Sequence, residues 1–139
     1  MGLFDALDAS GSALSAERLR MDVTAENLAN AQSTRGADGS GPYKRKEVVL
    51  EQAGSSFADS LQAARGVRVA GIVEDPTPAR RVYDPGHPDA DAEGYVTMPN
   101  VNTVTEMTDL IGASRAYEAN VTAMQTAKSM FARTLDLLK

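Results

Sequence analysis

The side chains best suited to chemistry lie in one short stretch, where His87 is followed by Asp89 and Asp91. A histidine beside carboxylates can act as a general base or bind a metal ion. His87 is the only histidine in the chain, and it lies in a turn between Gly86 and Pro88. The sequence has no recognisable nucleophile motif and no glycine-rich phosphate loop. We therefore predict that His87 makes a backbone hydrogen bond in a turn and that the chain has no catalytic residues.

The same stretch resembles the first half of a calcium-binding loop. Oxygen-bearing side chains alternate at Asp89, Asp91 and Glu93, and Gly94 takes the sixth position. Such a loop needs a bidentate glutamate at its twelfth position, where this sequence has Asn100. The chain contains no cysteine, which excludes a thiolate metal site and a disulfide framework. We predict a solvated acidic loop with no metal ion and no cofactor, and calcium is the less favoured alternative.

A short basic run, Lys44 to Lys46, follows Tyr43 and is the main candidate for binding anions. Acidic proteins and phospholipid head groups are conceivable partners. Three charges are too few for stable anchoring to a membrane. We predict that the run forms a solvated loop edge, and acidic segments of neighbouring copies are a further candidate partner.

Charge and hydropathy exclude two classes of partner. The chain has 139 residues and a net charge of −5, with no basic face for phosphate, so we predict no nucleic-acid partner. No apolar run approaches the roughly 20 residues that a spanning helix needs, so we predict no direct membrane insertion. Residues 1–8 lack the basic and long apolar regions of a cleaved secretory signal. Export that depends on an uncleaved terminus stays open.

Two long helices are predicted, one at each end of the chain. The first begins at Leu3 or Ser10 and runs to Asn30. The second begins after Asn102 or Thr103, where Thr103 and Glu106 fit a capping box, and it runs to the last residue. A helix of about 35 residues is about 50 Å long at 1.5 Å per residue, too long for so small a domain to cover.

Apolar heptads follow both helices and predict the faces that they bury. One helix cannot cover its own apolar stripe. The two ends therefore pack on each other, on copies of themselves, or on partner subunits, which indicates assembly rather than catalysis. We predict contacts through Leu7, Leu14, Met21, Leu28, Leu110, Tyr117, Val121, Met124, Phe131 and Leu135.

The middle of the chain is rich in turns and predicts short strands over residues 43–52, 67–72 and 80–83, and whether it holds more than three strands stays open. Residues 57–64 fit a short helix or a loop. The predicted fold class is therefore mainly α with a small β-containing middle.

Residues 10–30 resemble the N-terminal signature of bacterial flagellar rod and hook proteins. In that family a helix of small and aliphatic residues ends in an Asn-Leu-Ala-Asn element, here Asn27 to Asn30. Further stretches resemble the proximal rod proteins of the family: residues 82–91, 94–96, 98–102, 113–121 and 126–130. The resemblance adds Asn27 and Asn30 to the expected contact set.

The resemblance implies a structural subunit of the flagellar basal-body rod, polymerised helically in the periplasm with copies of itself and other rod proteins. It implies export through the flagellar type III apparatus without cleavage of a signal peptide. It also implies a coiled-coil-like inner domain from residues 1–32 and 101–139, with residues 33–100 forming an outer, β-containing domain. The alternative that the heptads leave open is a soluble coiled-coil adaptor, or a binding protein like an export chaperone.

Overall fold

The computed structural model describes residues 3–36, 41–53 and 66–136. Two long helices flank a small β-containing middle, so the predicted fold class is confirmed. The predicted element over residues 57–64 lies outside the described residues. In chain order the elements are α1 (Leu3–Ala29), β1 (Lys46–Gln52), β2 (Val67–Glu74), β3 (Arg80–Tyr83), β4 (Tyr95–Met98) and α3 (Thr103–Asp136).

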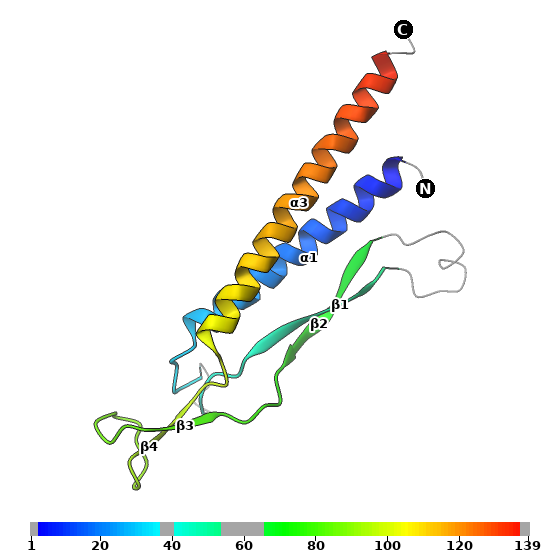
Figure 1. Cartoon of the computed structure of the whole chain (residues 1–139). Helices are drawn as coiled ribbons and strands as arrows, with labels where there is room; N and C mark the ends of the chain where they lie inside the picture. The colour runs from blue at the N-terminus through cyan, green and yellow to red at the C-terminus, as the bar shows by residue number, and fades with distance from the viewer. Residues whose placement is uncertain (1–2, 37–40, 54–65, 137–139) are drawn as a thin grey trace.

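The two helices lie side by side and antiparallel, with both ends of the chain at the same end of the molecule (Figure 1). Helix α1 begins at Leu3, the earlier of the two predicted starts, and it ends at Ala29. Helix α3 is the longer of the two, with 34 residues against 27 in α1. Among the described residues, no helix is long and apolar enough to cross a membrane.

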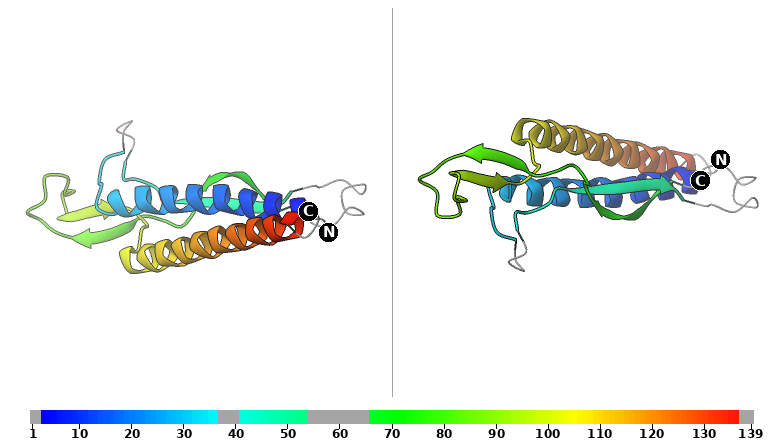
Figure 2. Two further views of the ribbon diagram at one scale, coloured as in Figure 1. Left: turned by 90° about the horizontal axis from the view of Figure 1, so that it is seen from above. Right: turned by 90° about the horizontal axis from the view of Figure 1, so that it is seen from below.

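Strands β1 and β2 form an antiparallel hairpin that runs along α1, while α3 lies beside the same helix (Figure 2). Within the described residues, the strands of this hairpin contact α1 but not α3. Alternate residues of β1, Val48 and Leu50 among them, are half-buried, as period-2 alternation requires. The backbone N–H of Val67 donates to Ser12 Oγ over 3.1 Å, which ties the start of β2 to α1.

Strands β3 and β4 form a second antiparallel pair at the end of the molecule far from the chain termini (Figure 1). The rings of Tyr83 and Tyr95 meet edge to face with centroids 5.2 Å apart. Gly94 has a φ of +83°, and a Cβ there would lie 2.9 Å from the ring of Tyr83. Glycine is therefore the residue that this turn requires.

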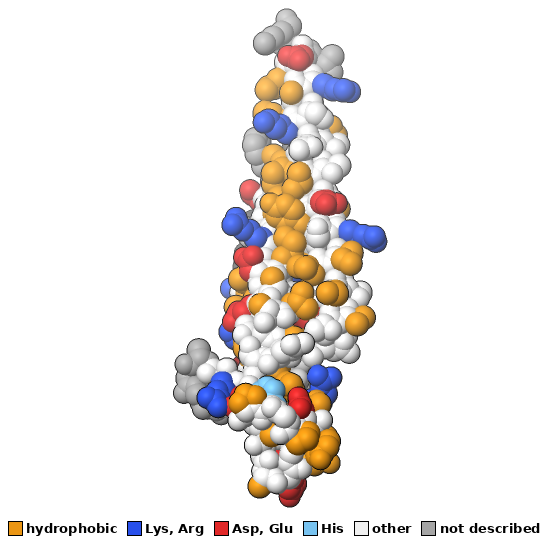
Figure 3. All heavy atoms as spheres, turned by 90° about the vertical axis from the view of Figure 1, so that its left-hand side faces the viewer, with side chains coloured by type: hydrophobic (Ala, Val, Ile, Leu, Met, Phe, Trp, Pro, Cys, Tyr) orange, Lys and Arg blue, Asp and Glu red, His pale blue; other side chains and the backbone are white. Residues whose placement is uncertain are grey.

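The interior is thin and built from small side chains. The fully buried apolar residues include Ala16, Val23, Val96 and Ala113, whereas many larger apolar side chains stay exposed. Figure 3 shows hydrophobic side chains running along the helical part of the molecule. The large exposed ones are Val49, Ile72, Val73, Tyr83, Tyr95, Val104, Met107, Ile111, Met130, Phe131 and Leu135.

Candidate functional site

The predicted apolar contact residues lie along the two packed helices. Eight of them are half-buried, four on each helix: Leu7, Leu14, Met21, Leu28, Leu110, Tyr117, Val121 and Met124. The helices approach closely at Gly11, where a Cβ would lie 3.8 Å from the methyl group of Met124. Part of the predicted stripe is therefore used within one chain, and none of these eight side chains is completely covered.

Phe131 and Leu135 continue the face of α3 that carries Tyr117 and Met124, but they are 39% and 47% exposed. A hydrogen bond between Asn27 and Glu106 aligns the two helices. Counting from that bond, Leu3 lies about 36 Å along α1, level with residue 130 of α3. The end of α3 therefore projects past α1, and its apolar face projects with it.

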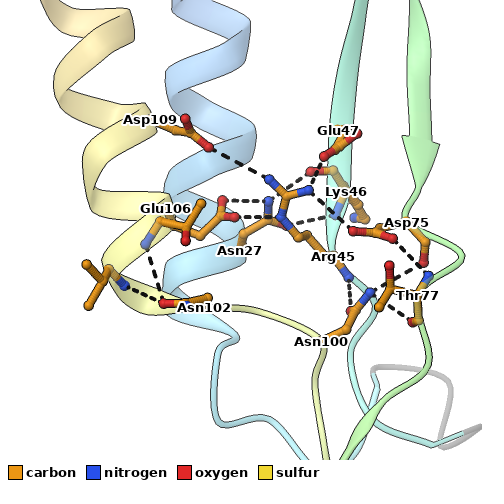
Figure 4. A network of polar contacts seen from close by, with 12 residues as sticks. Asn27, Arg45, Lys46, Glu47, Asp75, Thr77, Asn100, Asn102, Glu106 and Asp109 are labelled. Atoms are coloured by element: carbon orange, nitrogen blue, oxygen red, sulfur yellow. Dashed lines mark hydrogen bonds and ion pairs between the residues drawn. The ribbon is translucent and has the colours of Figure 1, made fainter.

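Asn27 lies in a buried polar cluster where α1, α3 and the start of β1 meet (Figure 4). Its Nδ2 donates to the Lys46 carbonyl over 2.8 Å and to Glu106 Oε2 over 3.0 Å. Its Oδ1 accepts from the Lys46 N–H and from the Tyr43 hydroxyl, both over 2.9 Å. This amide therefore makes four hydrogen bonds, the full number that a buried Asn can make.

Arg45 is the cation of this cluster (Figure 4). Its Nε donates to Glu106 Oε1 over 2.6 Å, and its other nitrogens reach Glu47, Asp75 and Asp109. The side chain is 17% exposed and that of Glu106 only 1%. Burial acts to lower the pKa of Arg45, but hydrogen bonds to Glu106 and Glu47 outweigh it and raise the pKa above its ordinary value. The prediction of a solvated loop edge is wrong for Arg45, because three of its four carboxylate partners come from distant parts of the same chain.

The two lysines of the basic run also have partners within the chain. Lys46 Nζ donates to Glu26 Oε1 over 2.6 Å, and this bond raises the pKa of Lys46. Lys44 forms an exposed ion pair with Glu74 over 3.0 Å. Burial and the charge of Glu26 raise the pKa of Tyr43, which keeps its hydroxyl protonated as the donor to Asn27.

The predicted capping box is wrong, because Glu106 turns into the polar cluster. The N-cap of α3 is Asn102, whose Oδ1 accepts from the N–H groups of Val104 and Thr105 over 3.0 and 3.4 Å. Asparagine is among the best residues for this role. Because Asn102 caps the helix, the side chain of Glu106 is not needed there, and it pairs with Arg45, 61 positions away.

Sequence reasoning also missed Asn100, which fixes the connection between β2 and β3. Its Oδ1 accepts from the Arg45 N–H over 2.9 Å, and its Nδ2 donates to the Thr77 carbonyl over 3.1 Å. Asn30, by contrast, bonds locally, to the Glu26 carbonyl and the Ser33 hydroxyl. Of the two predicted asparagines, only Asn27 joins distant segments.

A groove of about 360 Å³ lies beside the cluster, between α1, α3 and β1. Each of its charged side chains takes part in an ion pair, and Arg45 is shared among the three carboxylates of the groove. The residues that line it are Arg20, Val23, Thr24, Asn27, Arg45, Lys46, Glu47, Val48, Leu50, Glu106 and Asp109.

The acidic stretch around His87 makes hydrogen bonds within the fold. His87 Nδ1 accepts a hydrogen bond from the Asp89 N–H over 3.1 Å, as predicted for a turn histidine. Asp89 is not a solvated loop carboxylate as predicted, because it accepts hydrogen bonds from Thr34 and Arg35. Those bonds, that of Thr34 first, lower the pKa of Asp89. Within the described ranges, no three His, Cys, Asp or Glu side chains gather into a group that could hold a metal ion.

Two packed terminal helices, an incompletely covered apolar face and a polar cluster internal to the fold define a structural assembly protein. Residues 7–37 match the model for flagella basal body rod proteins, and residues 92–137 match the C-terminal model of the flagellar basal body rod FlgEFG proteins.

Relatives that match over their full length identify one family among the flagellar rod proteins. The flagellar basal-body rod protein FlgC of Yersinia enterocolitica is 50% identical over 99% of this chain and 98% of its own length. The FlgC protein of Bacillus subtilis is 46% identical over the whole of both chains, and that of Salmonella typhimurium 47% identical over 99% and 98%. The chain belongs to the FlgC family of flagellar basal-body rod proteins, which are structural and not enzymes. It is a rod component of the basal body that assembles with other rod components.

Proposed function

We propose that the chain polymerises helically in the proximal part of the rod, touching copies of itself and other rod proteins in the periplasm. In this proposal residues 1–32 and 101–139 form the inner part of the rod, and residues 33–100 form the outer part. The predicted contact set, from Leu7 to Leu135, supplies the faces that meet neighbouring subunits. The rod then forms part of the drive shaft for motility.

The observation that carries the proposal is the uncovered apolar surface of α3. Within one chain the large side chains of Met107, Ile111 and Leu135 stay exposed, while the buried apolar side chains are small. Covering one large apolar side chain is worth roughly 1.5–3 kcal/mol, so a few such contacts decide whether subunits associate. An exposed apolar surface of this kind marks a site of contact with another protein.

Substitution of the apolar face tests the proposal. Leu28→Asp and Met124→Asp place a charge between the helices, and Leu135→Asp places one beyond the end of α1, where it cannot disturb the α1–α3 contact. All three should block incorporation into basal bodies and abolish motility, while Ala123→Asp, on an exposed face of α3, should not. Normal motility in cells that make only the Leu135→Asp chain would overturn the proposal.

We also propose that the flagellar type III apparatus exports the chain unfolded and uncleaved. The absence of cysteine supports this route, because folding after export then needs no disulfide formation. Intact-mass measurement of the chain isolated from basal bodies should find the N-terminal residues 1–8 present, apart from an initiator methionine. A chain shortened by 15 residues or more would point to signal-peptide cleavage instead.

A further inference from the structure

We propose that α1 of one subunit packs against α3 of a second copy through a charge-matched face, with the two copies parallel and side by side. This contact deepens the proposed function, on which it rests, by naming the two surfaces that meet. It is distinct from the α1–α3 packing within one chain, because it uses exposed side chains of both helices.

The first surface is the exposed side of α1. Asp22, Arg18 and Asp8 follow one another along it, going away from Asn27, and alternate in sign as minus, plus, minus. All three side chains are exposed, and none has an ion-pair partner among the described residues. Two small exposed residues, Ala25 and Ala29, continue this surface toward the polar cluster.

The second surface is an exposed side of α3. Arg115, Glu118 and Arg133 follow one another along it in the same direction, with the opposite signs. They too are exposed and lack an ion-pair partner within the part of the chain that the structure describes. Two exposed apolar side chains, Met107 at 52% and Ile111 at 55%, continue this surface toward the polar cluster.

One displacement along the helices aligns most of these groups. Measured from the Asn27–Glu106 bond, Asp22 lies about 7.5 Å and Arg115 about 13.5 Å along their helices, a difference of about 6 Å. For Arg18 and Glu118 the difference is about 4.5 Å by the same count.

The apolar groups follow the same displacement. Counted in the same way, Ile111 against Ala25 and Met107 against Ala29 each differ by about 4.5 Å. A shift of roughly 5 Å between parallel copies thus brings two opposite-charge pairs and two large-to-small apolar pairs together. Asp8 and Arg133 differ by about 12 Å, so this third pair depends on the reach of the long arginine side chain.

The spacing of the charges also sets the orientation. In a dimer whose two-fold axis is perpendicular to the helices, α1 of one copy would run parallel to α3 of the other, and the unequal spacings of the two series would not match. A two-fold axis along the helices would allow no displacement between the copies. Parallel copies keep the two helices antiparallel, as they are within one chain (Figure 1). A contact between two different surfaces of parallel copies is heterologous, and it generates a ring or a helix of subunits.

Disulfide cross-linking in isolated basal bodies tests the contact. Because the chain has no native cysteine, any cross-link between copies of it must come from the introduced residues. Ala25→Cys with Ile111→Cys in one chain should give, on mild oxidation, a ladder of disulfide-linked copies. Ala25→Cys with Ala123→Cys, which moves the second thiol to another exposed face of α3, should give at least five-fold less. Equal ladders from the two pairs would overturn this contact. So would the absence of a ladder from the first pair, if the unsubstituted chain is present in basal bodies. Neither result would contradict the proposed function.

Charge exchange provides an independent measurement. Asp22→Arg and Arg115→Asp should each lower the number of copies per basal body several-fold, and the double variant should restore it. Failure of the double variant to recover would contradict the pairing. If the unsubstituted chain is absent from basal bodies, both the proposed function and this contact are wrong.

Discussion

Asn27 Nδ2 and Glu106 Oε2 are joined by a 3.0 Å hydrogen bond, although 79 positions separate the two residues in the chain. The bond links the helix that opens the chain to the helix that closes it. Because Asn27 also bonds both backbone groups of Lys46, it fixes the β1–β2 hairpin to the same point. One buried amide thereby sets the relative positions of three elements.

Removing this amide should destabilise the isolated chain. Asn27→Ala leaves one buried oxygen of Glu106 and the partly buried backbone groups of Lys46 without their partner. Buried polar groups that lose their partners cost about 1–3 kcal/mol each, so we expect a loss of about 2–4 kcal/mol. Urea unfolding followed by circular dichroism measures it. Asn30→Ala, which removes only local bonds, should lose less than about 1 kcal/mol, and an equal loss in both variants would contradict the role of Asn27.

Removing the cation of the cluster should cost still more. Arg45→Met leaves the buried Glu106 carboxylate without its charge partner, and breaking a buried pair in this way costs roughly 3–5 kcal/mol. Lys44→Met removes an exposed ion pair with Glu74, which is worth at most about 1 kcal/mol. Thermal unfolding of the two variants should therefore differ widely. If Arg45→Met unfolds at the temperature of the unsubstituted chain, the cluster does not stabilise the fold.

Local patterns in the sequence predicted the elements well, and the cluster poorly, for a physical reason. The period of apolar residues is a property of neighbours within a helix or strand, so both helices and three of the four short strands could be found from it. The pairing of Arg45 with Glu106 depends on how distant segments meet, and no local spacing reports it. A charged residue in a basic run is normally solvated, and a glutamate three positions after a threonine at a helix start normally completes a capping box.

Acid should weaken the contact between residues 34–35 and the β3–β4 turn. Hydrogen bonds from Thr34 and Arg35 lower the pKa of Asp89, so its pKa in the folded chain lies below the ordinary value of 3.8. Its stabilising contribution is therefore complete above pH 3.8 and is lost as the pH falls through the lower, folded-state pKa. Asp89→Asn should show a smaller drop in urea midpoint between pH 6 and pH 2.5 than the unsubstituted chain.

The control for this variant is Glu93→Gln, which removes an exposed carboxylate from the same turn. It should keep the full pH dependence that Asp89 confers. The same midpoint drop in Asp89→Asn and the unsubstituted chain would show that the Thr34 and Arg35 bonds contribute nothing to acid sensitivity.

The projecting end of α3 should matter for assembly and not for the stability of one chain. Leu135 is 47% exposed, so Leu135→Ser removes little buried surface within the chain and should change its unfolding free energy by less than about 0.5 kcal/mol. Incorporation into basal bodies should fall, because the substitution shortens the apolar face that a neighbour covers. The control is Met130→Ser, which changes an exposed side chain on another side of α3. Its incorporation into basal bodies should be higher than that of Leu135→Ser. A stability loss in Leu135→Ser as large as that of Leu14→Ser would place Leu135 in the intrachain core instead.

The attachment of the hairpin to α1 depends on a glycine. Gly66 has a φ of +104°, and a Cβ on it would clash with the Ser12 hydroxyl and lie 3.2 Å from the Ala9 Cα. Gly66→Ala should therefore combine a backbone strain of about 1–2 kcal/mol with loss of the Val67 N–H to Ser12 bond. Gly71→Ala, in the same hairpin, meets nothing within 4 Å and has no positive φ, so it is a matched control. We expect thermal unfolding several degrees lower for Gly66→Ala and little changed for Gly71→Ala. Equal unfolding temperatures for the two variants would show that the hairpin is held to α1 by other contacts.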